Sequence, residues 1–220
     1  MKSLINEFEK SKKIKVNIIT GKSDEFIERL KLEGVNSEAD ILLTTDIARL
    51  SRAKDNNLFK KVNSKILKKD IPSIYTSKDN DWFGLSIRAR PIIYSKERVN
   101  INELKDYQQL ADKKWKGRIC MRSSSNVYNQ SLVASLIANN GKRATADWAK
   151  SVVANMARDS KGNDRAQILA VAAGEADIAV ANTYYHALML SGKKGSEQQA
   201  AAKKVIPFFP NQQDRGTHMN

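Results

Sequence analysis

Two kinds of hydrophobic pattern alternate along this chain, and together they predict an α/β fold. Short apolar or alternating runs, which are typical of strands, occupy residues 14–20, 39–44, 118–122 and 177–181. Helical spacing of apolar residues, or a capping residue ahead of the segment, predicts helices at residues 3–9, 25–32, 46–54, 102–110, 127–139, 145–156 and 165–173. Strands that alternate with helices usually pair in parallel. We therefore expect parallel-rich sheets flanked by helices.

Long extended segments predict two lobes. Residues 82–95 form an extended run that is long enough to pass between lobes, and residues 205–210 are extended again and could be the return crossing. We assign residues 1–88 and 207–220 to a discontinuous, incomplete first lobe and residues 89–206 to a second lobe. Arg88 and Arg90 lie two positions apart, so a strand at that point places them on one face.

The composition is that of a folded chain. Its 220 residues are 41% hydrophobic, which is enough to build a core. No apolar run approaches the length of a membrane span. No signal peptide is visible, because Met1 leads directly into an amphipathic helical pattern.

The charge balance is strongly basic, with 38 basic and 24 acidic residues and a net charge of +14. Such an excess suggests an anionic partner or a general bias of the protein surface. The lysines are scattered singly and in pairs, which favours the surface bias. Cys120 is the one cysteine, so an intramolecular disulfide framework and a thiolate metal cluster are both excluded. Its apolar neighbours predict a buried thiol.

Three tyrosines follow predicted strands at the point where a helix begins. Tyr128 lies in the first turn of the helix after residues 118–122, and Tyr184 and Tyr185 follow residues 177–181. The carboxyl ends of parallel strands open on one edge of a sheet, where ligands bind. Aromatic side chains more often serve packing than binding. Nevertheless, because two such strand-to-helix junctions are predicted in one sheet, we infer that the three tyrosines lie near one another at a ligand-binding edge.

Phenol oxygens suit a hard trivalent cation. A phenol has a reference pKa near 10, so a phenolate at neutral pH needs a strong positive partner. Three phenolates would neutralise a 3+ ion, and Ser123, Ser124 and Ser125 at a helix start could hold an anion that completes the coordination shell. Zinc-type Cys/His spacing, a phosphate-binding glycine loop and a nucleophile elbow are all missing from the sequence.

The order of motifs along nearly the whole chain resembles the ferric-ion-binding proteins that serve bacterial ABC importers. The motifs are at residues 21–25, 39–42, 82–90, 115–118, 122–131, 162–164, 174–177, 182–185 and 209–218. The Ser-Ser-Asn-x-Tyr-Asn-Gln run at 124–130 and the Asn-Thr-Tyr-Tyr run at 182–185 are specific. The Gly-Glu-Ala-Asp run at 174–177 occurs in many binding proteins.

This resemblance implies the two-lobe type II periplasmic binding protein fold and a function in iron transport rather than catalysis. It makes Tyr128, Tyr184 and Tyr185 the phenolates that bind Fe³⁺, with Arg88 or Arg90 as the arginine near the site. A synergistic anion such as carbonate would bind with the metal. The implied partner is a membrane ABC importer permease, the implied location is the periplasm, and the implied state is a monomer that binds no nucleic acid.

The sequence also departs from the family pattern. The family takes a further iron ligand from its first strand, a tyrosine often preceded by histidine, and no residue here matches it. The chain begins after that strand and ends before the helices that finish the first lobe. We therefore expect a member shortened at both ends, with an unfilled sheet position in its first lobe.

Two alternatives remain open on the residues alone. The same fold could hold an anionic solute without metal, through Arg88, Arg90, Arg122 and residues 123–125. From a different class, a basic nucleic-acid-binding module would use the charge of +14 and would lose affinity steeply with salt.

Overall fold

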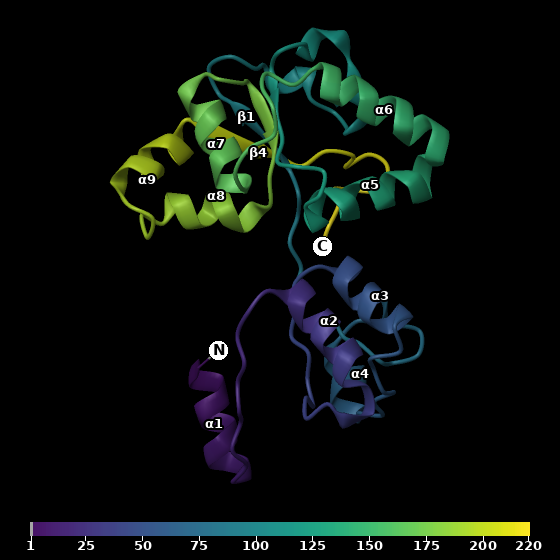
Figure 1. Cartoon of the computed structure of the whole chain (residues 1–220). Helices are drawn as coiled ribbons and strands as arrows, with labels where there is room; N and C mark the ends of the chain where they lie inside the picture. Colours follow the sequence, from purple (N-terminus) through teal and green to yellow (C-terminus); the bar gives the residue numbers. More distant parts are fainter. Residues whose placement is uncertain (1) are drawn as a thin grey trace.

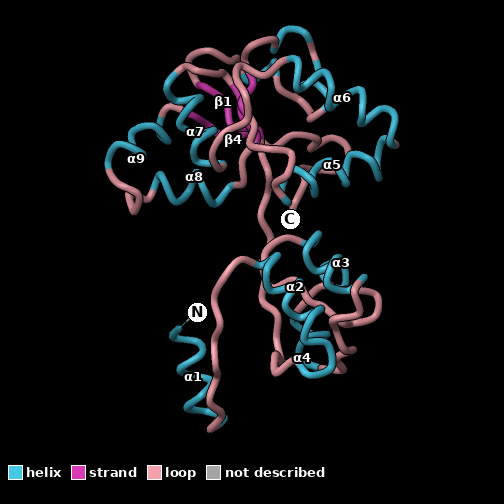
Figure 2. The backbone as a smooth tube through the Cα atoms, viewed as in Figure 1, coloured by secondary structure: helices cyan, strands magenta, loops and turns pink. Residues whose placement is uncertain are grey.

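The computed structural model describes residues 2–220. Figure 1 shows a lobe that contains the sheet and a lobe built from the first helices, joined by an extended segment. Figure 2 shows that the strands all lie in the lobe that contains the sheet, whereas loops connect the helices of the other lobe. We call them the sheet lobe and the helical lobe. No helix among the described residues is long and apolar enough to cross a membrane.

The sheet lobe is built on four short strands in the order β2-β3-β1-β4. They are β1 (Ile92–Ser95), β2 (Ile119–Cys120), β3 (Ile178–Val180) and β4 (Val205–Phe208). Strands β2 and β3 pair in parallel, whereas β1 is antiparallel to both β3 and β4. The α/β class is therefore confirmed, with a mixed sheet whose parallel pair is the one that precedes the tyrosines.

Helices cover both faces of this sheet. They are α5 (Val127–Asn140), α6 (Lys142–Ala154), α7 (Asp164–Ala173), α8 (Thr183–Leu190) and α9 (Ser196–Lys203). Alternation along β1 separates two cores, because Ile92 packs with the cluster that includes Leu132 of α5 and Ile93 with the cluster that includes Ile168 of α7. Figure 1 shows α5 and α6 on one side of the sheet and α7, α8 and α9 on the other.

Local capping sets where these helices begin and end. The side chain of Asn126 accepts from the backbone N–H of Tyr128 at the start of α5, and Asn163 accepts from that of Ala166 in α7. Gly174 ends α7 in the left-handed region at φ 86°. Each of these asparagines therefore satisfies a backbone N–H group in the first turn of its helix. Asn182 precedes α8, but its side chain makes no capping hydrogen bond.

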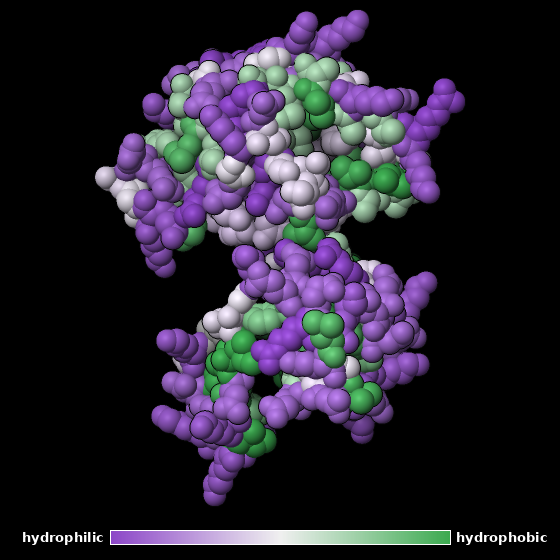
Figure 3. Space-filling model, in the orientation of Figure 1, coloured by the Kyte–Doolittle hydropathy of each residue, from purple (hydrophilic) through white to green (hydrophobic). Residues whose placement is uncertain are grey.

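The helical lobe differs from the prediction. It contains α1 (Lys2–Lys12), α2 (Ser23–Glu33), α3 (Ile47–Asp55) and α4 (Lys65–Asp70), and within described residues 2–88 no strand forms. Residues 14–20 and 39–44, predicted as strands, are extended but unpaired, which leaves Ile19 64% and Ile41 84% exposed. A strand needs hydrogen-bonded neighbours as well as an apolar pattern. Figure 3 shows apolar side chains at the surface of this lobe.

The extended run predicted at residues 82–95 is present (Figure 1), whereas the helix predicted at residues 102–110 was wrong. Residues 82–90 make only isolated bridges, Phe83 with Thr76 and Ala89 with Met219, before the chain enters β1. The helix predicted at 102–110 is two short 3-10 turns, Ile101–Glu103 and Gln108–Ala111. Between these turns the backbone bonds to a distant segment and not within a helix. Asn211 donates its N–H to the carbonyl of Lys105, and its side chain accepts from the N–H of Tyr107.

The last residues of the chain lie along the sheet lobe and reach the junction of the lobes. The backbone of Asn220 exchanges two hydrogen bonds with that of Arg88, each 2.8 Å long. Its side chain donates to Asp46, which caps α3 in the helical lobe. Figure 1 shows this end of the chain between the two lobes. The division into residues 1–88 with 207–220 and residues 89–206 stays a prediction.

Candidate functional site

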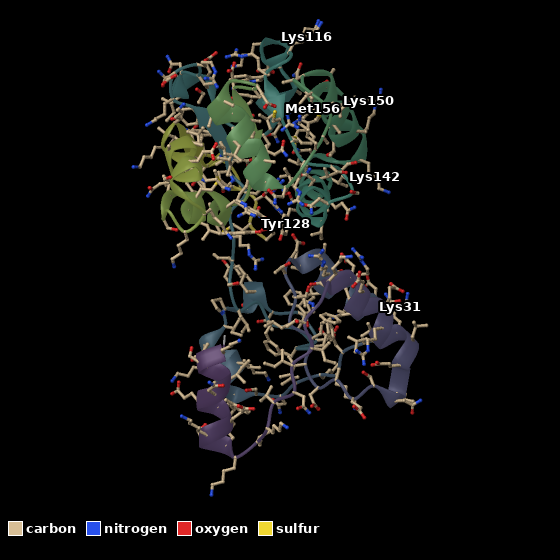
Figure 4. The ribbon with its side chains drawn as sticks, turned by 60° about the vertical axis from the view of Figure 1, so that its left-hand side comes forward. Lys31, Lys116, Tyr128, Lys142, Lys150 and Met156 are labelled. Carbon is tan, nitrogen blue, oxygen red and sulfur yellow. The ribbon has the colours of Figure 1, made fainter. Side chains whose placement is uncertain are left out.

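The three tyrosines meet at one edge of the sheet. Tyr128 starts α5 just after β2, and Tyr184 and Tyr185 start α8 just after β3, so the parallel pairing of the two strands brings the helix starts together. The phenol oxygens of Tyr128 and Tyr184 lie 3.3 Å apart. The rings of Tyr184 and Tyr185 stack with centroids 4.2 Å apart. Figure 4 shows Tyr128 on the side of its lobe that faces the helical lobe.

Protonation of this cluster is governed by its surroundings. Burial, and then the neighbouring hydroxyls of Tyr128 and Tyr185, raise the pKa of Tyr184 above its ordinary value. Without a positive ligand, Tyr184 therefore keeps its proton at neutral pH. A cation that binds between these oxygens has to displace protons, which makes binding pH-dependent.

The two candidate arginines occupy different positions. Arg88 is half-buried, and its guanidinium lies 5.8 Å from the centre of the Tyr184 ring, beside the cluster. Arg90 is fully buried, with its guanidinium 5.9 Å from the Tyr128 ring, and it is hydrogen-bonded to Asp164 and Asn182. Arg88 is therefore the one of the two that a ligand can reach.

The serine run forms a turn ahead of α5. The hydroxyl oxygens of Ser123 and Ser125 lie 2.8 Å apart, and the backbone N–H of Ser125 donates to Ser123. Ser123 and Ser125 line a cleft of about 350 Å³, and Arg122 joins them there. Ser124 is exposed and is not among the residues that line the cleft. The structure thus brings two of the three predicted serines to one open, polar space.

The opposite wall of this cleft comes from the helical lobe. It consists of Asp24, Arg49 and Arg52, where both arginines bond to the Asp24 carboxylate. Hydrogen bonding by Arg49 is the main reason that the pKa of Asp24 is lowered. No local motif in the sequence marks these three residues as neighbours. The spacing of Arg49 and Arg52 on one helix was the only signal, and that spacing does not tell which surface they face.

The histidines do not join the tyrosines. His186 is buried, and its Nε2 lies 3.0 Å from the carbonyl oxygen of Ala202, as expected for a histidine used in packing. His218 lies beside α5, with Nε2 3.1 Å from the hydroxyl of Ser131. Across residues 2–220, no group of three or more His, Cys, Asp or Glu side chains could hold a metal ion. The phenols are the hard oxygen donors that this edge offers.

Comparisons with known proteins agree on one family. A family model described as bacterial extracellular solute-binding protein matches residues 36–209. Iron uptake protein A1 of Synechocystis sp. is 54% identical over 207 residues, which cover 94% of this chain and 57% of that protein. Iron uptake protein A2 of the same organism is 45% identical, over 93% of this chain and 60% of that protein. The chain thus spans less than two thirds of the length of these relatives.

Solved structures of related proteins share the fold of this chain. A Trichodesmium protein in complex with iron and citrate matches with a TM-score of 0.95 and 50% sequence identity, covering 100% of this chain and 69% of that one. The ferric binding protein from Campylobacter jejuni matches with a TM-score of 0.92 and 43% identity, covering 99% of this chain and 69% of that one.

Proposed function

The chain belongs to the family of bacterial extracellular solute-binding proteins, and on this premise we propose that it binds ferric iron through Tyr128, Tyr184 and Tyr185. The observation that carries the proposal is the convergence of the phenols, with the oxygens of Tyr128 and Tyr184 3.3 Å apart. The names of the relatives, iron uptake proteins, and the iron in the Trichodesmium structure support the choice of metal.

The chemistry of the cluster suits this cargo. Fe³⁺ is a hard cation that prefers oxygen ligands, and its charge offsets the cost of removing phenol protons. Arg88 lies beside the Tyr184 ring, where its charge also favours phenolates. An anion such as carbonate, held at Ser123, Ser125 and Arg122, would complete the coordination shell on the cleft side.

The biological role follows from the family. We propose that the protein carries iron in the periplasm, as a monomer, to a membrane ABC importer permease, without catalysis and without nucleic acid. Two arginines of the helical lobe, Arg49 and Arg52, face the same cleft and would approach the bound anion.

Titration with a chelated ferric salt tests the proposal. The protein should develop a visible phenolate-to-iron absorption band, which each of the changes Tyr128→Phe, Tyr184→Phe and Tyr185→Phe should shift or weaken. Phenylalanine keeps the ring and removes the oxygen, so packing changes little. Tyr75→Phe and Tyr94→Phe, which lie away from the cluster, should leave the band unchanged.

Two results would contradict the proposal. One is wild-type protein without a ferric band, and the other is a triple Tyr→Phe variant that keeps the band. Thermal stabilisation by carbonate or citrate without any colour would indicate instead a solute-binding protein that uses the Arg122 and serine cleft for an anion alone. Tight, salt-sensitive binding of nucleic acid would contradict the proposed role in iron transport.

A further inference from the structure

A fully buried carboxylate lies beneath the tyrosine cluster. Asp164, the first residue of α7, is 0% exposed. One of its oxygens accepts from Nη1 of Arg90 at 2.9 Å and from the backbone N–H of Asn182 at 2.7 Å. The other accepts from Nη1 of Arg122 at 3.2 Å. Asp164 thereby connects the residue before α8, a residue two positions after β2 and the extended segment that leads into β1.

Arg90 extends these connections to both tyrosine-bearing helices. Its guanidinium donates to the side chain of Asn182, which lies two positions before Tyr184, at 3.1 Å. The other terminal nitrogen donates to the side chain of Asn129, the residue directly after Tyr128. The amide of Asn129 in turn donates to the carbonyl of Arg122 at 2.8 Å. Each helix start that carries a tyrosine is therefore bonded to the same guanidinium.

Stability is a poor explanation for this arrangement. Removing two charges from water costs about as much as their mutual attraction returns, and well-packed apolar residues of the same volume do as well or better. A planar guanidinium instead imposes geometry, because its nitrogens hold several acceptors in fixed directions. Here those acceptors belong to α5, α7 and the residue that precedes α8. The guanidinium groups of Arg90 and Arg122 also lie 5.9 and 5.5 Å from the Tyr128 ring.

We propose that Arg90, Asp164 and Arg122 form a positioning network that sets the distance between the phenols of Tyr128 and Tyr184. This inference rests on the proposed ferric function for its purpose, but the geometry it concerns exists without metal. None of the three residues is proposed as an iron ligand. Their role is to hold α5 and α8 in one relative position, so that the oxygens are already close when the ion arrives.

The sheet lobe contains a matched control at the other end of the strands. Asp177 also accepts from two arginines, Arg98 and Arg118, and its side chain is 16% exposed. It precedes β3, whereas the tyrosines follow β2 and β3. Asp177→Asn should therefore remove a similar pair of ionic contacts without moving the phenols.

The test with iron compares Asp164→Asn with Asp177→Asn, because Arg122 is also proposed to hold the anion beside the metal. Substitution of residues that orient metal ligands typically lowers metal affinity about 10–100-fold. We expect a loss of ferric affinity of this size in Asp164→Asn. At saturating iron, its absorption band should also move, since the band depends on phenolate geometry and not on stability. Asp177→Asn should lower the melting temperature but keep both affinity and band position.

A metal-free measurement separates this inference from the ferric function. Tyrosines labelled with ¹³C at Cζ should show altered NMR shifts for Tyr128 and Tyr184 in Asp164→Asn, and unaltered ones in Asp177→Asn. If wild-type protein binds no iron, the ferric proposal fails and these shifts alone decide the positioning role. If Asp164→Asn does not fold, Arg122→Gln, whose side chain is 16% exposed, should show a smaller change at Tyr184. Tyr184 is the reporter in this variant, because the Arg122 guanidinium lies 5.5 Å from the Tyr128 ring and its removal alters the Tyr128 shift directly. Wild-type shifts in a folded variant of the network, or equal changes in Asp177→Asn, would overturn the inference.

Discussion

His218 is expected to make the metal-free protein sensitive to mild acid. Burial, and then the positive charge of Arg90, lower the pKa of His218 from its ordinary value of 6.5 to about 4. The imidazole sits against α5, beside the hydroxyl of Ser131, and its backbone N–H donates to the phenol oxygen of Tyr107. Protonation would place a second positive charge near Arg90, which holds the starts of both tyrosine-bearing helices.

The sign and the size follow from linkage. A histidine with a lower pKa in the folded state binds its proton more weakly there than in the unfolded chain. The stabilisation that the neutral His218 side chain gives to the folded state is therefore fully present above pH 6.5 and is lost as the pH falls through about 4. At 1.36 kcal/mol per pKa unit, we expect a total loss of at most about 3.4 kcal/mol, of which about 2 kcal/mol is lost by pH 5. Partial exposure of the ring makes these values upper limits.

Urea unfolding of the metal-free protein at pH 7 and pH 5 measures this loss. His218→Gln has no titrating group at this position. Between pH 7 and pH 5, the free energy of unfolding of wild type should therefore fall by up to about 2 kcal/mol more than that of His218→Gln. Burial raises the pKa of the nearby Asp46, but this carboxyl is present in both wild type and His218→Gln, so its contribution cancels in the comparison. Equal losses in wild type and His218→Gln would refute the reasoning.

Three further outcomes are expected. Leu132→Ala removes a side chain that is 0% exposed in the core between α5 and the sheet, and should lower the free energy of unfolding in urea by about 2–5 kcal/mol. Gly174→Ala meets no atom within 4 Å but requires φ near 86°, so calorimetry should show a loss of about 1–2 kcal/mol from backbone strain alone. Burial raises the pKa of the Cys120 thiol, so a thiol reagent should react slowly with the folded protein and fast in urea.

Local sequence determined most of the sheet lobe. The strands and helices at residues 118–139 and 165–181, and the helix start after residue 182, were predicted because apolar spacing and capping residues act within a few residues. The convergence of Tyr128 and Tyr184 was also predictable, since parallel strands end on one edge. The resemblance to ferric-ion-binding proteins, drawn from motifs along the chain, is confirmed by the family and its solved structures.

Tertiary structure decided what local patterns cannot contain. Residues 14–20 and 39–44 have strand patterns, but a strand exists only where another backbone pairs with it, and none does in the described chain. The sequence placed Arg88 and Arg90 together, whereas folding buried Arg90 with Asp164 and left Arg88 beside the tyrosines. Arg49 likewise lines the cleft only because the folded chain brings the helical lobe beside the serine run. The surroundings of a charge come from distant segments, and only the folded chain brings those segments together.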